Sequence, residues 1–391
     1  MSRLKEGIEK EISNIFDNIV DFRKNIHMYP ELGYKEIETT NRIVNILEKN
    51  NVKVYRFENI TGAIANIFNN CEKTIAVRVD IDALPIRENT GLSFTSKNKE
   101  VMHACGHDVH TSIGVGLAVL LNRFKEDLKV NVKIIFQPAE ECSPRGGAKL
   151  LIEKGVLSNP KVSEVYGFHV WPSYKIGEIG IKPGAIMAAS DRFKIIIKGK
   201  NAHAAEPHKG VDAISIGADI INAVEFKLKR EINAFEPCII SIGKINSTGR
   251  YNIICDHTEL EGTIRTLSED SRKKIQSRLK EIVKGISNSY GADYDIDIIN
   301  GYNPVLNNEQ LTASFIKSAE KILGGENVKT NIKPSLIGED FSAFCKHKPS
   351  LYFHLGCDSK YPLHSDRFFA DNETIKVGLR LLGLYIIEEI A

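Results

Sequence analysis

The stretch Val130-Asn131-Val132-Lys133-Ile134-Ile135-Phe136-Gln137-Pro138-Ala139-Glu140-Glu141 decides the fold class of this chain. Its apolar part, Val130 to Phe136, predicts a buried strand. Lys73 to Pro85 and Glu164 to Val170 predict two more strands, and a helix is predicted from about Thr111 to Leu128. This alternation of strand and helix indicates an α/β fold, with a mainly parallel sheet and helices on both faces.

Reactive side chains follow the carboxyl ends of these predicted strands. Asp80 and Asp82 end the first strand, Glu140 and Glu141 follow the second, and His169 lies at the end of the third. In open α/β sheets this edge is where ligands bind. The sequence therefore predicts a functional site there.

A second pattern begins near Ala185. The order strand, helix, strand, strand, helix, strand is that of an α+β ferredoxin-like unit, and its predicted elements are 192–199, 211–226, 238–245, 258–266, a helix capped by Ser268, and 293–299. We therefore predict a compact insert of residues 187–299. Residues 1–186 and 300–391 then form one discontinuous main domain, which opens with an apolar helical stripe from Leu4 to Ile26 and closes with a helix from about Thr374 to Ile390.

The composition excludes several classes of protein. Lys and Arg number 52 against 50 Asp and Glu, so the chain has no basic field, and we expect neither nucleic acid nor a membrane as partner. The longest apolar runs, such as Ile113 to Leu121, are shorter than the roughly 18 residues of a membrane span. The segment Met1 to Glu6 has no apolar signal region, so a cytoplasmic location is expected. Seven Cys without a Cys-x-x-Cys pair suggest neither a disulfide framework nor a zinc finger.

The segment Met102 to Thr111, Met-His-Ala-Cys-Gly-His-Asp-Val-His-Thr, is the strongest chemical signal. It places three His and one Cys at the expected start of a helix, which is a pattern typical of metal ligands. Gly106 lets the backbone bend so that Cys105 and His107 can converge, and a helix start favours the thiolate. The alternative is a buried Cys beside loop histidines.

Glu140 and Glu141 form the second signal. Adjacent residues of an extended chain point in opposite directions, so one carboxylate can bind a metal while the other faces a water molecule. This division suits metal-assisted hydrolysis, in which the second Glu takes a proton from water. Two exposed glutamates in a loop are the alternative, but the preceding buried strand and Pro138 favour a site.

Four other residues have weaker signals. His169 and His364 are candidate ligands, although a lone His at such a place is more often structural. Asp82, like Asp80, is a candidate ligand, an acid that orients a ligand His, or a solvated carboxylate. His203, in the loop after the first strand of the insert, is placed either to donate a hydrogen bond to an oxyanion or to cap that strand.

Taken together, these segments resemble the amidohydrolases that include N-acyl-L-amino-acid amidohydrolase, hippurate hydrolase and the auxin-conjugate hydrolases. That family is part of the dinuclear-metal aminoacylase and carboxypeptidase superfamily. The resemblance spans nearly the whole chain and rests on segments in the right order: His27–Gly33, Asp80–Pro85, Cys105 with His107, Phe136–Glu141, His169, the His203 loop, Glu261–Thr266, Gly338–Ser342 and Leu363-His364.

The resemblance implies roles for individual residues. Glu140 matches the general base, and the residues that match the family's metal ligands are Cys105, His107, Glu141, His169 and His364. Asp82 matches an acid that steers the site, and His203 matches a histidine that approaches the scissile carbonyl. Asn252 and Arg265 lie where the family holds the substrate carboxylate. Two divalent ions per subunit are implied, and mixed N, O and S ligands suit Zn, Mn, Co or Ni.

The resemblance also implies a reaction and an assembly. We expect a metal-dependent amidohydrolase that cleaves small N-acyl-L-amino acids to a carboxylate and an amino acid. A carboxypeptidase or dipeptidase acting on peptides, or an N-acetyl-diaminopimelate deacetylase, is the alternative on the same site. The insert is expected to act as lid and dimerisation domain, in a homodimer or a dimer-based tetramer. A catalytically silent relative that binds a metabolite or partner would lack a ligand or the base, and none is missing here.

This chain departs from the family's pattern beside the expected site. Cys255 stands where the family usually has a proline after Asn252-Ile253-Ile254, which leaves the local geometry of the lid open. Cys142 and Arg145 replace part of a glycine-rich stretch, and their position suggests an effect on substrate choice. None of these departures involves a predicted metal ligand.

Overall fold

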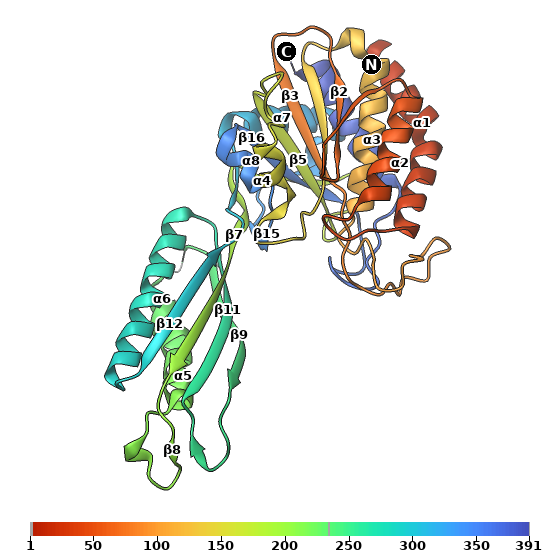
Figure 1. The fold of residues 1–391 in the computed structure, drawn as a ribbon. Coiled ribbons are helices and arrows are strands. Elements are labelled where there is room, and N and C mark those ends of the chain that lie inside the picture. The colour runs from red at the N-terminus through yellow and green to blue at the C-terminus, as the bar shows by residue number, and fades with distance from the viewer. Residues whose placement is uncertain (1–2, 234, 391) are drawn as a thin grey trace. The chain divides into compact units, whose positions relative to one another are not determined.

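The computed structural model describes residues 3–233 and 235–390, which form two compact units (Figure 1). The first unit contains the chain up to Ile186, the segment Leu306–Lys333 and the chain from Asp340 onwards. The second contains Met187–Val305 and Pro334–Glu339. The second unit is thus longer than the predicted insert of residues 187–299. The reason is that β13 (Val305–Asn307) and β15 (Ser335–Gly338) both pair with β7 (Gly184–Lys198), a contact between segments far apart in sequence.

A mixed sheet forms the centre of the first unit. Its strand order is β1 (Lys53–Arg56), β2 (Ala63–Ile67), β4 (Asn131–Gln137), β3 (Thr74–Asp80), β5 (Glu164–Trp171), β16 (Ser350–Gly356), β6 (Ile179–Gly180) and β14 (Val328–Lys329). The four central strands β4, β3, β5 and β16 are parallel, and the first three of them are the strands that the sequence predicts. The flanking strands β2 and β6 are antiparallel to their central neighbours. Strands β4, β3 and β16 are buried along their whole length, which is why they appear as near-continuous apolar runs.

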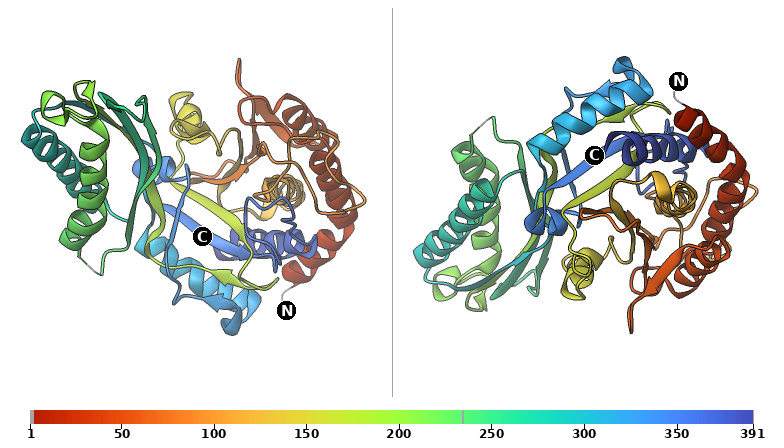
Figure 2. Two further views of the ribbon diagram at one scale, coloured as in Figure 1. Left: turned by 90° about the horizontal axis from the view of Figure 1, so that it is seen from below. Right: turned by 90° about the horizontal axis from the view of Figure 1, so that it is seen from above.

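Helices cover both faces of this sheet (Figure 2). α1, α3 and α9 pack against one another on one face, and α4 packs with α8 on the other. The helices and helical turns of this unit are α1 (Arg3–Met28), α2 (Ile37–Lys49), α3 (His107–Arg123), η1 (Lys125–Asp127), α4 (Gly146–Glu153), α7 (Glu309–Leu323), η5 (Gly325–Asn327), α8 (Ser342–His347), α9 (Glu373–Leu384) and η6 (Tyr385–Glu389).

The apolar stripe of α1 is buried as predicted. Ile8, Ile12 and Ile26 are fully inaccessible to solvent, and each such side chain stabilises the fold by about 2 kcal/mol relative to an exposed one. Among the described residues, no helix is long and apolar enough to cross a membrane. The cytoplasmic location stays a prediction.

The start of α3 differs from the prediction. This helix begins at His107 rather than near Thr111, because Gly106 adopts a left-handed conformation (φ 82°) immediately before it. A side chain at position 106 would also meet Val170 at 2.4 Å. The turn at Gly106 therefore places Cys105 just before the helix and His107 in its first turn.

The second unit is a ferredoxin-like α+β unit. Its antiparallel sheet has the order β12 (Asp293–Asn300), β7, β11 (His257–Thr266) and β9 (Cys238–Ser247). α5 (Ala213–Asn222) and α6 (Glu269–Ser289) lie together on one face of it (Figure 2). The chain order β7, α5, β9, β11, α6, β12 is the predicted one.

A helix cap and a separate apolar core stabilise this unit. Ser268 caps α6 as predicted, because its hydroxyl oxygen accepts the N–H of Ser271 at 3.1 Å. A separate apolar core lies under the helices and includes Phe193, Leu260 and Leu279. The shorter elements of the unit are β8 (Ala202–His203), η2 (Pro207–Lys209), η3 (Ala223–Lys227), η4 (Leu228–Glu231) and β10 (Ile253–Ile254).

Candidate metal centre

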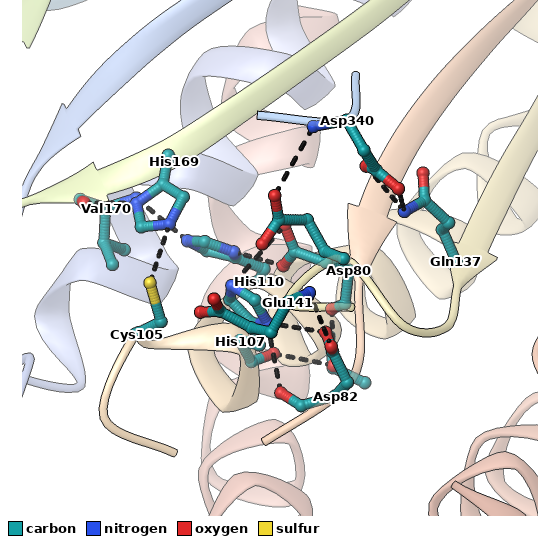
Figure 3. A network of polar contacts seen from close by, with 12 residues as sticks. Asp80, Asp82, Cys105, His107, His110, Gln137, Glu141, His169, Val170 and Asp340 are labelled. Atoms are coloured by element: carbon teal, nitrogen blue, oxygen red, sulfur yellow. Dashed lines mark hydrogen bonds and ion pairs between the residues drawn. The ribbon is translucent and has the colours of Figure 1, made fainter. Parts of the chain in front are cut away.

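The strand order of the first unit places the site. β3 lies between β4 and β5, so the connection from β3 to β4 and the connection from β4 to β5 run in opposite directions along the sheet. Ligands bind at the carboxyl ends of the strands around such a switch point. Asp80 ends β3, Glu141 follows β4 and His169 lies near the end of β5, and Figure 3 shows these side chains together with Cys105 and His107 from the start of α3.

The predicted ligands converge in two overlapping groups. Cys105, His107 and His169 form one, and Cys105, Glu141 and His364 form the other; in each group the ligand atoms lie within 4.8 Å of one another. The Sγ atom of Cys105 is 3.3 Å from Nε2 of His169 and 3.3 Å from Nε2 of His364. Oε1 of Glu141 is 3.1 Å from the same His364 nitrogen. Because Cys105 belongs to both groups, its sulfur would be available to two bound ions.

The chemistry of this cluster fits two divalent cations. Nε2 of His107 is buried and makes no hydrogen bond within the described part of the chain; its ion-pair neighbour, Oδ2 of Asp80, is 3.8 Å away. Leaving such a nitrogen unbonded costs about 1–3 kcal/mol, which a coordinated cation would offset. One sulfur, three imidazoles and a carboxylate make a mixed donor set suited to divalent metal ions.

Asp82 orients two of the predicted ligands. Its Oδ1 accepts the Nδ1–H of His107 at 2.9 Å, which leaves Nε2 of that ring directed at the cluster. Its Oδ2 accepts the backbone N–H of Glu141 at 2.9 Å. Of the roles left open for Asp82, the geometry corresponds to an acid that orients a ligand histidine.

His110 connects two strands behind the cluster. Its Nε2 accepts the backbone N–H of Val170 at 2.9 Å, so its Nδ1 carries the proton and donates it to Oδ1 of Asp80 at 2.5 Å. The Nδ1–H of His169 donates to the carbonyl of Val170 at 2.7 Å, which directs Nε2 of His169 toward Cys105 (Figure 3). Both nitrogens of His110 are therefore engaged within the protein.

Glu140 is buried beside the cluster, within 4.8 Å of the ligand atoms of His107 and Glu141. Its Oε1 accepts the backbone N–H of Asp340 at 3.4 Å. Asp340 is in turn fixed by the fully buried Arg78, whose Nη2 donates to Oδ1 at 2.7 Å. Sequence reasoning missed Arg78, although an arginine inside the apolar run Val77-Arg78-Val79 was a signal, since such a group is buried only when paired.

Burial and the neighbouring carboxylates together shift the pKa values of the cluster. Burial, together with the charges of Glu141 and Glu140, raises the pKa of the Cys105 thiol well above its usual value. Burial alone would lower the pKa of His107, but the charge of Asp80 and the hydrogen bond to Asp82 raise it to about 10. A divalent cation would balance this negative potential.

The three candidate substrate residues lie in the second unit and do not converge there. His203 and Asn252 are exposed neighbours on the β8–β10 pair, where the N–H of Ala204 donates to the carbonyl of Asn252 at 3.1 Å. The β8–β10 pair adjoins the end of β11 at which His257 pairs with Lys198. Arg265 lies near the opposite end of β11. At about 3.3 Å per residue these ends are roughly 26 Å apart, too far for one small substrate to reach both in one chain.

Comparison with known proteins identifies the family. The model of the peptidase family M20/M25/M40 matches residues 76–388. Thermostable carboxypeptidase 1 of Saccharolobus solfataricus is 39% identical over 383 residues, which cover 96% of each chain. N-acetylcysteine deacetylase of Bacillus subtilis is 35% identical over 380 residues, covering 95% of this chain and 97% of the relative.

A solved structure agrees over the same length. The YxeP protein of Bacillus subtilis, a dinuclear metal binding peptidase of the M20 family, superposes with a TM-score of 0.85 at 32% identity, covering 97% of this chain and all of the other. Its similarity supports the mainly parallel domain with an inserted unit that the sequence predicts. The chain therefore belongs to the peptidase family M20/M25/M40 and is a hydrolase of amide bonds.

Proposed function

We propose that this protein is a dinuclear metal-dependent amidohydrolase that cleaves N-acyl-L-amino acids to a carboxylate and a free amino acid. The observation that carries the proposal is the pair of ligand groups sharing Cys105, with the buried carboxylate of Glu140 beside them. The similarity to an N-acetylcysteine deacetylase supports the acyl-amino-acid substrate.

The proposed mechanism assigns each residue a task. Two divalent ions, held by Cys105, His107, Glu141, His169 and His364, would polarise the amide carbonyl and lower the pKa of water toward about 7. Glu140 accepts the proton of the attacking water and returns it to the leaving amine nitrogen. The N–H of Asp340 holds one oxygen of Glu140 in place during these transfers.

Residues of the second unit would complete the site. His203 donates a hydrogen bond to the developing oxyanion, and Asn252 and Arg265 hold the free carboxylate of the substrate. Because His203 and Arg265 lie at opposite ends of β11, we propose that one of them is supplied by a second subunit. The edge strand β9 exposes Ile239 and Ile245 and supports pairing between second units in a homodimer or dimer-based tetramer.

A mixing experiment tests this assembly. Glu140→Gln and His203→Ala are each expected to be inactive alone. If His203 acts across the dimer, a mixture that exchanges subunits regains activity, because one hybrid site has both residues intact. A mixture that stays inactive after confirmed subunit exchange contradicts action across the dimer, and a monomer in sedimentation analysis contradicts the assembly itself.

Glu140→Gln tests the proposed base. Its turnover of N-acetyl amino acids should fall at least about 10²-fold while the metal content stays that of the wild type. The exposed Glu48→Gln on α2 is the matched control. Unchanged turnover in Glu140→Gln would sink the assignment, and a protein that binds no metal and ignores chelators would contradict the whole proposal.

A carboxypeptidase is the second candidate, because the relative with 39% identity has that name. The two activities use the same proposed machinery and differ only in the acyl side of the scissile bond. Kinetics on matched pairs, such as N-acetyl-leucine and a dipeptide ending in leucine, distinguish them. A kcat/KM higher for the peptides would favour the carboxypeptidase, and N-acetyl-diaminopimelate belongs in the same panel.

A further inference from the structure

The segment just before α2 packs against the turn that presents Glu140 and Glu141. Glu36, the last residue before α2, is completely buried. Its Oε1 accepts the backbone N–H of Ala139 at 2.7 Å, and its Oε2 accepts the hydroxyl of Thr61 at 2.6 Å. Glu36 thus holds the residue that immediately precedes the proposed base.

Ala139 has a backbone conformation that its side chain disfavours. Its φ is +55°, in the left-handed region, where an L-residue with a Cβ is strained. It is also fully buried, between the end of β4 and Glu140. Strained conformations of this kind persist only where the surroundings enforce them, and they cluster at functional sites.

The packing around the turn shows what enforces this conformation. A Cβ at Gly33 would lie 3.0 Å from Cα of Ala139 and 2.4 Å from Sγ of Cys142, so the backbone before α2 rests directly on the turn. On the far side of Glu140, Asp82 accepts the N–H of Glu141 at 2.9 Å. The backbone N–H groups of Ala139 and Glu141, the residues on either side of Glu140, are therefore each held by a carboxylate.

A purely structural role explains Glu36 poorly. Burying a carboxyl group is costly, and an apolar side chain that fills the same space usually serves stability as well or better. Burial and the charge of Asp82 raise the pKa of Glu36 to about 7. The protein thus retains a buried carboxyl group although its burial costs free energy. Both oxygens of Glu36 accept hydrogen bonds, one of them from the N–H of the strained residue Ala139.

We propose that Glu36 is a positioning residue, which holds the Ala139 peptide in its left-handed conformation and thereby sets the directions of Glu140 and Glu141. The inference rests on the proposed function, since it acts through the base and a metal ligand assigned there. Either protonation state of Glu36 can accept the Ala139 N–H, so the role does not depend on its titration.

Two substitutions at this position separate the role from its alternatives. Glu36→Ala removes the acceptor, and kcat should fall about 10- to 100-fold with KM changed by less than about threefold, because small misplacements of a catalytic group are costly. Glu36→Gln keeps an oxygen for Ala139 and an amide that can donate to Thr61. It should therefore retain kcat within about fivefold, with the pH profile of the wild type.

A second-site change tests the link to Ala139. Glycine adopts positive φ without penalty, so adding Ala139→Gly to Glu36→Ala should recover at least about threefold of the lost kcat. Glu38→Ala, at an exposed residue in the first turn of α2, is the matched control and should behave as wild type. If Glu36→Ala does not fold, Glu36→Asp, which withdraws the carboxylate by one methylene, should show the same loss of kcat.

These measurements separate failure of the positioning role of Glu36 from failure of the proposed function. Wild-type kcat in Glu36→Ala or Glu36→Asp, beside an inactive Glu140→Gln, overturns the positioning role and leaves the proposed base standing. An active Glu140→Gln overturns the proposed function and the positioning role with it. Absence of any recovery in the Ala139→Gly double variant also contradicts the positioning role, because the strain at Ala139 would then not be what Glu36 opposes.

Discussion

Asp82 holds Glu141 by the backbone: its Oδ2 accepts the N–H of Glu141 at 2.9 Å. The other oxygen of the same carboxylate accepts the Nδ1–H of His107 at 2.9 Å. One side chain therefore fixes two proposed ligands that come from different elements, the turn after β4 and the start of α3. An acid placed in this way controls the geometry of a metal site without touching the ions.

Replacing Asp82 by Asn should weaken metal binding. The amide has one acceptor oxygen instead of two, so either His107 or Glu141 loses its partner. We expect the metal affinity of Asp82→Asn, measured by competition with a chelator, to fall about 10- to 100-fold. The exposed Asp17→Asn on α1 is the control, and equal affinities in both variants would contradict the orienting role.

Cys105 should determine how many ions are bound. Because its sulfur belongs to both ligand groups, Cys105→Ala removes a donor from each at once. Metal analysis should show a loss of more than one ion per chain relative to the wild type. Cys71→Ala, which removes a half-buried thiol elsewhere in the first unit, should keep the full content. Loss of a single ion from Cys105→Ala would argue against a bridging sulfur.

The only tryptophan of the chain should report on the metal centre. The ring of Trp171 lies 6.1 Å from that of the proposed ligand His169 and stacks on His354 at 3.8 Å. Paramagnetic ions such as Co²⁺ quench a nearby indole, so Co²⁺ added to chelator-treated protein should lower the emission of Trp171. His169→Ala should weaken this response, and a signal indifferent to metal would place the ions elsewhere.

His27 should make stability depend on pH. Burial alone would lower its pKa, but hydrogen bonds to Asp108 (2.9 Å) and Glu88 (3.2 Å) raise it from 6.5 to about 9. A folded-state pKa above the unfolded one means that the stabilisation is complete below about pH 6.5 and is lost as the pH rises toward 9. The shift corresponds to about 3 kcal/mol.

Thermal unfolding checks this dependence. The melting temperature of the wild type should fall between pH 6.5 and 9, and the difference between wild type and His27→Gln should shrink over the same interval. Comparing the two proteins at each pH cancels the titration of groups that they share. A difference that is constant, or that grows with pH, would contradict the assignment.

Features of short range could be predicted from the sequence. The central parallel strands, the apolar stripe of α1, the Ser268 cap and the ferredoxin-like order of the second unit all follow from periodicity and end signals within a few residues. The candidate ligands also follow from local patterns. Most of them are reactive residues at strand ends and at a helix start, which the topology of a parallel sheet brings together. His364 lies in a loop, and only the resemblance to the family implies its role as a ligand.

Features that depend on distant partners could not be predicted. Glu36 meets Ala139, and Arg78 meets Asp340, across separations of 103 and 262 residues. Pairing of β15 with β7 likewise extends the second unit beyond residue 299. No local pattern encodes which distant group a buried side chain will meet.

The sequence by itself thus determined the elements, their order and the reactive residues at their ends, because hydrophobic periodicity and turn chemistry act over a few neighbours. Only the tertiary structure decided that Glu36 holds the turn before Glu140, that burial and nearby carboxylates raise the pKa of Cys105, and that His203 and Arg265 lie far apart in one chain. The physical reason is that pairing, burial and electrostatic potential are sums over groups brought together by the whole fold.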